Sequence, residues 1–74
     1  MEKQKELELE NLSNSDLSNL IDEWIRSDRD RAILKRRLID GICYEPLAEE
    51  FDLSVRQVKN IIYKGQDRLF NHLF

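Results

Sequence analysis

LAEEFDLSVRQVKNI, residues 47–61, has the spacing of two helices that cross at a steep angle after a short turn. The first helix of such a pair needs an apolar residue, then a small residue where its partner crosses closely, and another apolar residue one turn later. The turn needs an apolar plug, and the second helix needs two inward-facing anchors. The chain fills these six positions with Leu47, Ala48, Phe51, Leu53, Val58 and Ile61. The stretch therefore predicts a helix-turn-helix.

The turn and the start of the second helix are also marked in the sequence. Asp52 stands where such a turn usually has glycine, and aspartate tolerates the left-handed backbone region better than most residues. Ser54 can cap the second helix, and Gln57, three residues later, completes a capping box. We therefore expect helices over about 44–52 and 54–73.

A capped start at Ser54 determines which side chains of the second helix face outward. We expect a DNA-contacting surface formed by Ser54, Val55, Arg56, Gln57, Lys59, Asn60, Tyr63 and Lys64. Arginine can bind guanine through two hydrogen bonds, glutamine or asparagine can bind adenine, and lysine suits phosphate. A polar face of this kind is also typical of any solvated helix, and helix-turn-helix cores also dock proteins. Spacing alone therefore leaves both functions open.

Two further helices are expected upstream. Residues 16–26, capped by Ser15 or Asp16, repeat apolar residues at steps of three and four. Residues 28–40 form the next helix, which Gly41 can end by adopting the left-handed conformation. The predicted fold is thus all-α, a small four-helix domain. The polar side of helix 28–40 offers secondary phosphate contacts at Lys35, Arg36 and Arg37.

The first residues differ in composition from the rest of the chain. Residues 1–14 are rich in Glu and Lys, and their leucines form no wide apolar stripe. We interpret them as a frayed helix or a disordered tail, and a partner-binding helix is the alternative. The helical domain then covers residues 15–74.

Charge is distributed unevenly along the chain. The net charge is −3 and the pI is about 5.1, whereas nucleic-acid-binding domains are usually basic. However, residues 1–30 hold nine acids and four bases, whereas residues 31–74 hold six acids and eight bases. The local field governs contact with phosphates, so the acidic total does not exclude DNA binding.

The sequence contains no group of residues that predicts an enzyme. Cys43 is the single cysteine and is expected to be a small buried hydrophobe, and His72 is expected to complement a helix dipole. One cysteine and one histidine make neither a metal cluster nor a catalytic pair, so we expect no metal, no cofactor and no enzyme. No signal peptide or membrane-length apolar run is present, and the default expectation is a soluble cytoplasmic protein.

Several residues have two readings. We expect Trp24 in the core. Gly65 either allows another helix to approach closely or only weakens the helix to which it belongs. Phe70 and Phe74 are harder to bury in a domain of this size, so a homodimer contact is an open alternative.

The chain from Arg29 to Leu73 resembles the DNA-binding region 4 of bacterial sigma-70-type factors. The matching residues are Arg29-Asp30-Arg31-Ala32-Ile33-Leu34, Leu38, Gly41, residues 47–54, Val58-Lys59-Asn60-Ile61 and Arg68-Leu69. The match covers about 45 of the 74 residues and includes the helix that precedes the helix-turn-helix.

The resemblance implies a regulator that reads promoter-like DNA in the major groove. The chain has no room for the sigma domain that grips core polymerase, so it looks like a stand-alone region 4-like protein of the phage or mobile-element type. In the family, an Arg-Glu pair follows the capping residue, whereas this chain has Val55 and Arg56, so the family's DNA preference is not carried over. Gln57, Lys59 and Asn60 carry over as contact residues. Docking on RNA polymerase or on a sigma factor is the alternative function that the resemblance implies.

Overall fold

The computed structural model describes residues 12–73, and its side-chain description ends at residue 71. Within residues 12–73 it contains no strand and four helices, which confirms the all-α prediction. The helices are α2 (Asn14–Trp24), α3 (Asp28–Leu38), α4 (Tyr44–Glu50) and α5 (Val55–Leu73). Each of the first three ends two residues before the expected position. The predicted tail at residues 1–11 and Phe74 lie outside the described residues, as do the side chains of His72 and Leu73.

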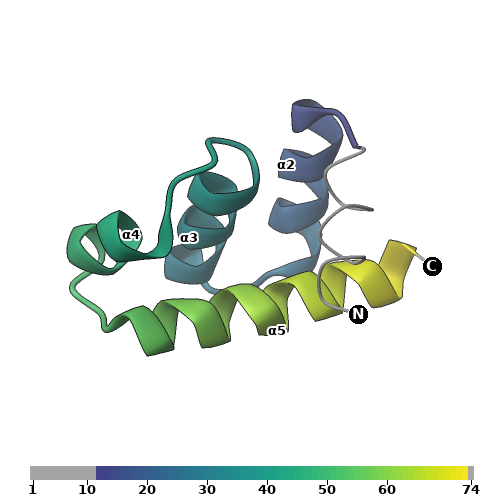
Figure 1. Ribbon diagram of the computed structural model, residues 1–74. Coiled ribbons are helices and arrows are strands. Elements are labelled where there is room, and N and C mark those ends of the chain that lie inside the picture. Colours follow the sequence, from purple (N-terminus) through teal and green to yellow (C-terminus); the bar gives the residue numbers. More distant parts are fainter. Residues whose placement is uncertain (1–11, 74) are drawn as a thin grey trace.

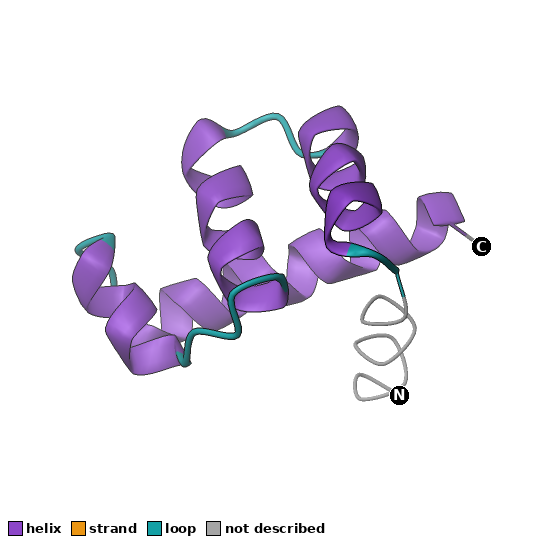
Figure 2. Ribbon diagram, turned by 90° about the horizontal axis from the view of Figure 1, so that it is seen from above, coloured by secondary structure: helices purple, strands orange, loops and turns teal. Residues whose placement is uncertain are grey.

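The long helix α5 organises the domain. It runs along one side of the molecule, and α2, α3 and α4 all lie on the other side (Figure 1). Figure 2 shows these three shorter helices side by side across α5. The α5 helix packs against each of them, and α3 also packs against α2 and α4. The buried core is formed by Leu17, Ile21, Ile25, Ile33, Leu34, Leu47, Ala48, Val58, Ile62 and Leu69.

Serine side chains cap the first two helices. The amide of Asp16 donates to Ser13 Oγ at 3.1 Å, and the amide of Asp30 donates to Ser27 Oγ at 3.3 Å. The cap of α2 is therefore Ser13, and the predicted cap at Ser15 or Asp16 is wrong. The backbone of Ser13 is extended and the chain is already helical from Asn14, so the predicted capping residues lie inside the first turn.

One arginine closes the corner between α2 and α3. The guanidinium of Arg31 donates to the carbonyl oxygens of Ile25 at 2.9 Å and Arg26 at 3.0 Å, and it also contacts the carboxylate of Asp28. Carbonyl groups at the end of a helix have no partner within the helix, and Arg31 supplies donors at this end. The corner is thereby held by a side chain of the next helix.

The connection from α3 to α4 differs from expectation at its cysteine. Gly41 has a φ of 72°, which confirms its predicted left-handed conformation. Cys43 is exposed, so its predicted burial is wrong. Cys43 has extended backbone and its neighbours Ile42 and Tyr44 are half-buried. Because successive side chains of an extended segment point in opposite directions, the cysteine between two inward-facing residues faces solvent.

The turn between α4 and α5 has the expected backbone conformation. Asp52 adopts a φ of 56°, and the amide of Leu53 donates to the carbonyl of Ala48 at 2.8 Å. The six residues expected at the crossing of these helices all belong to the core or pack against it. Ile61 is only half-buried, however, and the fully buried residues in the first half of α5 are Val58 and Ile62.

Gly65 lies where α5 passes close to Leu34 of α3. A methyl group built at Gly65 would lie 2.5 Å from Leu34 Cδ1 and 2.8 Å from Leu34 Cδ2, which is far inside normal contact. The close-approach reading of Gly65 is therefore confirmed. Trp24 and Phe70 are both half-buried, and Trp24 packs against the core as expected.

Candidate functional site

A reciprocal cap defines the start of α5. The amide of Ser54 donates to Gln57 Oε1 at 2.9 Å, and the amide of Gln57 donates to Ser54 Oγ at 3.1 Å. The predicted capping box is confirmed. The amides of Val55 and Arg56 precede the first hydrogen bond within the helix, so they contribute partial positive charge at this end of α5.

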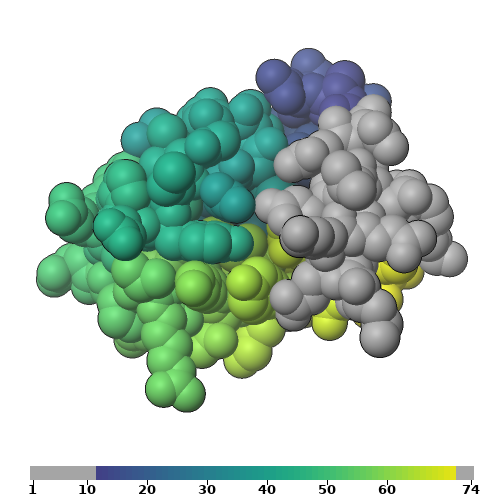
Figure 3. Space-filling view, in the orientation of Figure 1, coloured from purple at the N-terminus to yellow at the C-terminus, as the bar shows by residue number. Residues whose placement is uncertain are grey.

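Most of the predicted contact residues share one accessible surface of α5. Figure 3 shows the first half of α5 along the lower edge of the molecule, beneath α3 and α4. Arg56, Asn60, Tyr63 and Lys64 are exposed and recur at steps of three or four residues, which places them on neighbouring parts of one helix face. Ser54 and Gln57 are also exposed beside them. We call this set, residues 54, 56, 57, 60, 63 and 64, the α5 surface.

The other two predicted contact residues are less accessible. Val55 is half-buried and packs against the core, because it lies on the flank of α5 that faces the other helices. Lys59 is half-buried as well, and its Nζ lies 5.4 Å from the centroid of the Tyr44 ring. Arg37 lies over the same ring, with its Cζ 4.5 Å from the centroid.

The three predicted secondary phosphate contacts have different surroundings. Lys35 Nζ lies 2.7 Å from the carboxylate of Asp22 on α2. Arg36 binds Glu50 of α4 at 2.8 Å and Asp40 at 3.4 Å, and the hydrogen bond to Glu50 raises the pKa of Arg36 above its already high usual value. Lys35 and Arg36 therefore both form ion pairs with carboxylates of the same chain.

Arg37 is the one member of this predicted set that lies over the same aromatic ring as Lys59. One nitrogen of its guanidinium donates to the carbonyl oxygen of Ile42 at 3.3 Å, and its Cζ lies over the ring of Tyr44. A cation from α3 and a cation from α5 thus lie at one ring contributed by α4.

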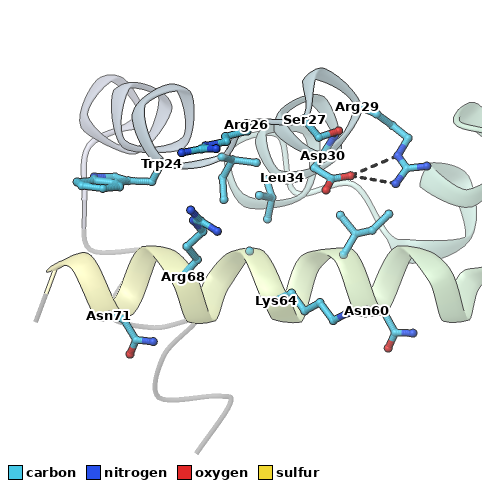
Figure 4. Close-up of a pocket in the computed structure, with 13 residues that line it drawn as sticks. Trp24, Arg26, Ser27, Arg29, Asp30, Leu34, Asn60, Lys64, Arg68 and Asn71 are labelled. Carbon is cyan, nitrogen blue, oxygen red and sulfur yellow. Dashed lines mark hydrogen bonds and ion pairs between the residues drawn. The ribbon is translucent and has the colours of Figure 1, made fainter.

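A groove that the sequence did not reveal lies beside the α5 surface. It has a volume of about 680 Å³ and opens between the α2–α3 corner and residues 60–71 of α5 (Figure 4). Its apolar lining comes from Trp24, Ile25, Leu34, Ile61 and Gly65. Three separate segments build it, so no local pattern in the sequence could have identified it.

Positive side chains surround this groove. Arg26, Arg29, Lys64 and Arg68 line it, and Arg68 extends from α5 toward Trp24 and Arg26 (Figure 4). Arg29 is paired with Asp30 at 3.3 Å. Lys64 and Asn60 belong to both the groove and the α5 surface, so the two features are continuous.

Two other kinds of feature are absent from the described part of the chain. Among residues 12–73, no cluster of three His, Cys, Asp or Glu side chains could hold a metal ion. No helix in this range combines the length and the apolar character needed to cross a membrane.

Comparison of the chain with protein-family models, with curated proteins and with solved structures gave no match in any of the three searches.

Proposed function

We propose that this protein is a transcriptional regulator that binds duplex DNA sequence-specifically and reads the major groove with the start of α5. In this proposal α4 and α5 form a helix-turn-helix. The observation that carries it is the capped, exposed start of α5, where Arg56, Asn60 and Lys64 share one surface and residues 54–66 include no Asp or Glu.

The dimensions of α5 agree with this role. The major groove of B-DNA is about 12 Å wide and admits an α-helix. The ten residues from Val55 to Lys64 rise about 15 Å along the helix axis, at about 1.5 Å per residue. A helix that enters the groove end-on would therefore place Arg56 near the bases and Lys64 near the phosphates at the groove edge.

The cap assigns different roles to the two amide side chains of the α5 surface. Reading adenine with a carboxamide uses both its oxygen and its nitrogen. The oxygen of Gln57 already accepts the hydrogen bond from Ser54, so adenine reading falls to Asn60. Arg56 is the candidate for guanine, and Lys64 is the candidate for a phosphate contact.

We further propose that the domain is a stand-alone relative of sigma-70 region 4. The order of the helices and the packing of the six predicted residues at the α4–α5 crossing support this proposal. Val55 and Arg56 stand where the family has its Arg-Glu pair, so we expect a target sequence different from that of the family.

Selection of bound sites from a random duplex library, followed by binding assays at several salt concentrations, tests the proposal. We expect Arg56→Ala and Asn60→Ala to relax base preference at single positions. Lys64→Ala should weaken binding to all sequences alike and lower the salt slope by about one. Lys35→Ala is the matched control, and its effect should be smaller because Asp22 already pairs with Lys35. If the folded protein binds no duplex at low salt, the proposal fails.

The groove favours a second candidate function, docking on RNA polymerase or on a sigma factor. Its apolar lining at Trp24 and Ile61 suits an apolar side chain of a partner, and its positive edge suits acidic neighbours. Binding of purified RNA polymerase and of purified sigma factor, each measured without DNA, tests this function. Arg68→Glu should reduce such binding strongly, whereas Glu45→Gln on α4 should not. No binding to either partner would eliminate this candidate.

A further inference from the structure

The groove between the α2–α3 corner and α5 has the size of a small-molecule site. Its volume of about 680 Å³ lies within the range of about 300–1,000 Å³ that is usual for ligand pockets. Thirteen residues line it, whereas a stable protein interface takes about 20–30 residues from each partner. A partner protein would have to cover much more surface than this groove offers, but a small molecule would not.

The inner lining of the groove is apolar. Leu34 has 0% exposure and Ile25 has 7%. At the buried Gly65, α5 adds only backbone to this lining, and Trp24 and Ile61 line the groove as half-buried side chains. Such a surface favours a ligand with a flat apolar body, and an aromatic ring gains further from an offset or edge-on contact with an indole.

Positive charge borders this apolar lining on both walls. Arg26 and Arg29 belong to the α2–α3 corner, and Lys64 and Arg68 belong to α5. Among the described residues that line the groove, Asp30 is the only acid, and it pairs with Arg29 at 3.3 Å. None of the ion pairs formed among residues 12–71 involves the other three cations. The charge of the groove therefore favours an anion.

We propose that this groove binds a small aromatic carboxylate, and that the bound molecule weakens the binding of DNA. The ring of the ligand lies on the apolar lining. Its acid group binds Arg68, which extends from α5 into the groove, while Arg26 adds positive charge from the facing wall (Figure 4). A guanidinium group suits this role because it can bind a carboxylate through two parallel hydrogen bonds.

The effect on DNA arises at Lys64 and rests on the proposed function, whereas the ligand site itself does not. Lys64 lines the groove and also belongs to the α5 surface. It lies four residues before Arg68, so the two side chains are neighbours on the helix. A bound carboxylate therefore places negative charge close to a phosphate held by Lys64. At a separation of about 7 Å in water, this repulsion lowers affinity for DNA by about two- to threefold.

Nuclear magnetic resonance titration with naphthoate tests the ligand site. Trp24 is the only tryptophan of the chain, so its indole N–H gives one signal, which should shift as naphthoate binds. A ligand of this size should bind with a Kd on the order of 1 mM. Naphthalenemethanol has the same ring without the charge and acetate has the charge without the ring, so both should bind at least about threefold more weakly. An indole signal that stays in place up to about 10 mM naphthoate would overturn the site.

Charge-removing variants locate the acid group of the ligand. Arg68→Gln should weaken binding of naphthoate by about three- to tenfold, and Arg26→Gln should weaken it by about two- to threefold. Lys35→Gln is the matched control, because it removes one positive charge outside the groove, where Asp22 pairs with Lys35, and it should leave the affinity unchanged. Arg26 and Arg68 are exposed, and urea unfolding of each variant establishes that folded proteins are compared. Equal affinity of Arg68→Gln and the unchanged protein would overturn the role of Arg68.

Binding of duplex DNA at low salt, with and without naphthoate, tests the effect on DNA. Naphthoate should weaken DNA binding by about two- to threefold in the unchanged protein. At the same concentration it should have less effect on Arg68→Gln, which holds less of the ligand. Naphthoate that shifts the Trp24 signal but leaves DNA binding unchanged would overturn the effect on DNA. Absence of any DNA binding would overturn the proposed function and this effect together, and the titration alone would then decide the ligand site. Binding of RNA polymerase without any binding of naphthoate would assign the groove to protein docking and overturn the proposal.

Discussion

Replacement of Gly65 by alanine tests how tightly α3 and α5 are packed. Glycine inside a helix is less favourable than alanine by about 0.8–1 kcal/mol. In the absence of neighbours, Gly65→Ala would therefore raise the free energy of unfolding by about that amount. The surroundings of Gly65 oppose this gain.

The opposing effect comes from one fully buried side chain. The new methyl carbon would lie 2.5, 2.8 and 3.1 Å from three carbon atoms of Leu34. Leu34 is fully buried, and its Cγ as well as both Cδ carbons lie within 3.1 Å of the new methyl carbon, so the side chain would have to shift as a whole. Overpacking of a dense core costs about 1–3 kcal/mol. The steric cost equals or exceeds the gain in helix propensity, and the difference between the two predicts a net destabilisation of up to about 2 kcal/mol.

Urea unfolding followed by circular dichroism measures this change. For a domain of this size, each kcal/mol corresponds to a shift in Tm of about 4–8 °C, so the expected effect is well resolved. Leu34→Ala alone should destabilise the domain by about 2–5 kcal/mol. Combined with Gly65→Ala it should cost less than the sum, because the added methyl group occupies part of the vacated space. A stabilising Gly65→Ala, or strict additivity with Leu34→Ala, would refute the packing argument.

Substitutions at three further sites, measured by the same unfolding assay, and one chemical modification test local features of the fold. Ser54→Ala should lower the free energy of unfolding by about 1 kcal/mol through loss of its hydrogen bond to the Gln57 amide. Arg31→Ala should lower it by about 1–3 kcal/mol, since two carbonyl groups lose a charged donor, and a change near zero would show that water replaces the guanidinium. Gly41→Ala should cost about 1–2 kcal/mol because its φ is 72°, whereas Gly41→Asn should cost less. A thiol reagent should modify Cys43 in the folded protein about as fast as in urea, and protection in the folded state would contradict its exposure.

The parts of the fold that were predicted correctly depend on residues close together in the sequence. The capping box of Ser54 and Gln57 involves residues three positions apart, and the left-handed residues Asp52 and Gly41 each reflect a preference of a single residue. The apolar spacing of residues 47–61 also identified the core positions of the α4–α5 pair, with Ile61 less buried than expected. The start of α2 was less well predicted, because a serine cap competes with other short polar residues nearby, as Ser13 does with Ser15 and Asp16.

Burial in connecting segments was harder to predict than burial in helices. Cys43 was expected in the core on the basis of its residue type, which is often buried in proteins. Its side chain faces solvent because the extended backbone between Ile42 and Tyr44 gives alternate residues opposite directions. The order Ile42-Cys43-Tyr44 was present in the sequence, but only the path of the loop shows that Ile42 and Tyr44 point inward.

The composition of the candidate DNA surface follows from the sequence, since the cap at Ser54 and the period of the helix determine which residues of α5 face outward. Which group each charged side chain on and around that surface contacts depends on the tertiary structure. Lys35, Arg36 and Arg37 are neighbours in one helix. Lys35 nevertheless forms an ion pair with Asp22 and Arg36 forms one with Glu50, whereas Arg37 lies over the ring of Tyr44, as Lys59 does. Helical periodicity acts over a few residues and can be read from their order, whereas these contacts join residues up to 15 positions apart and exist only once the helices have packed against one another.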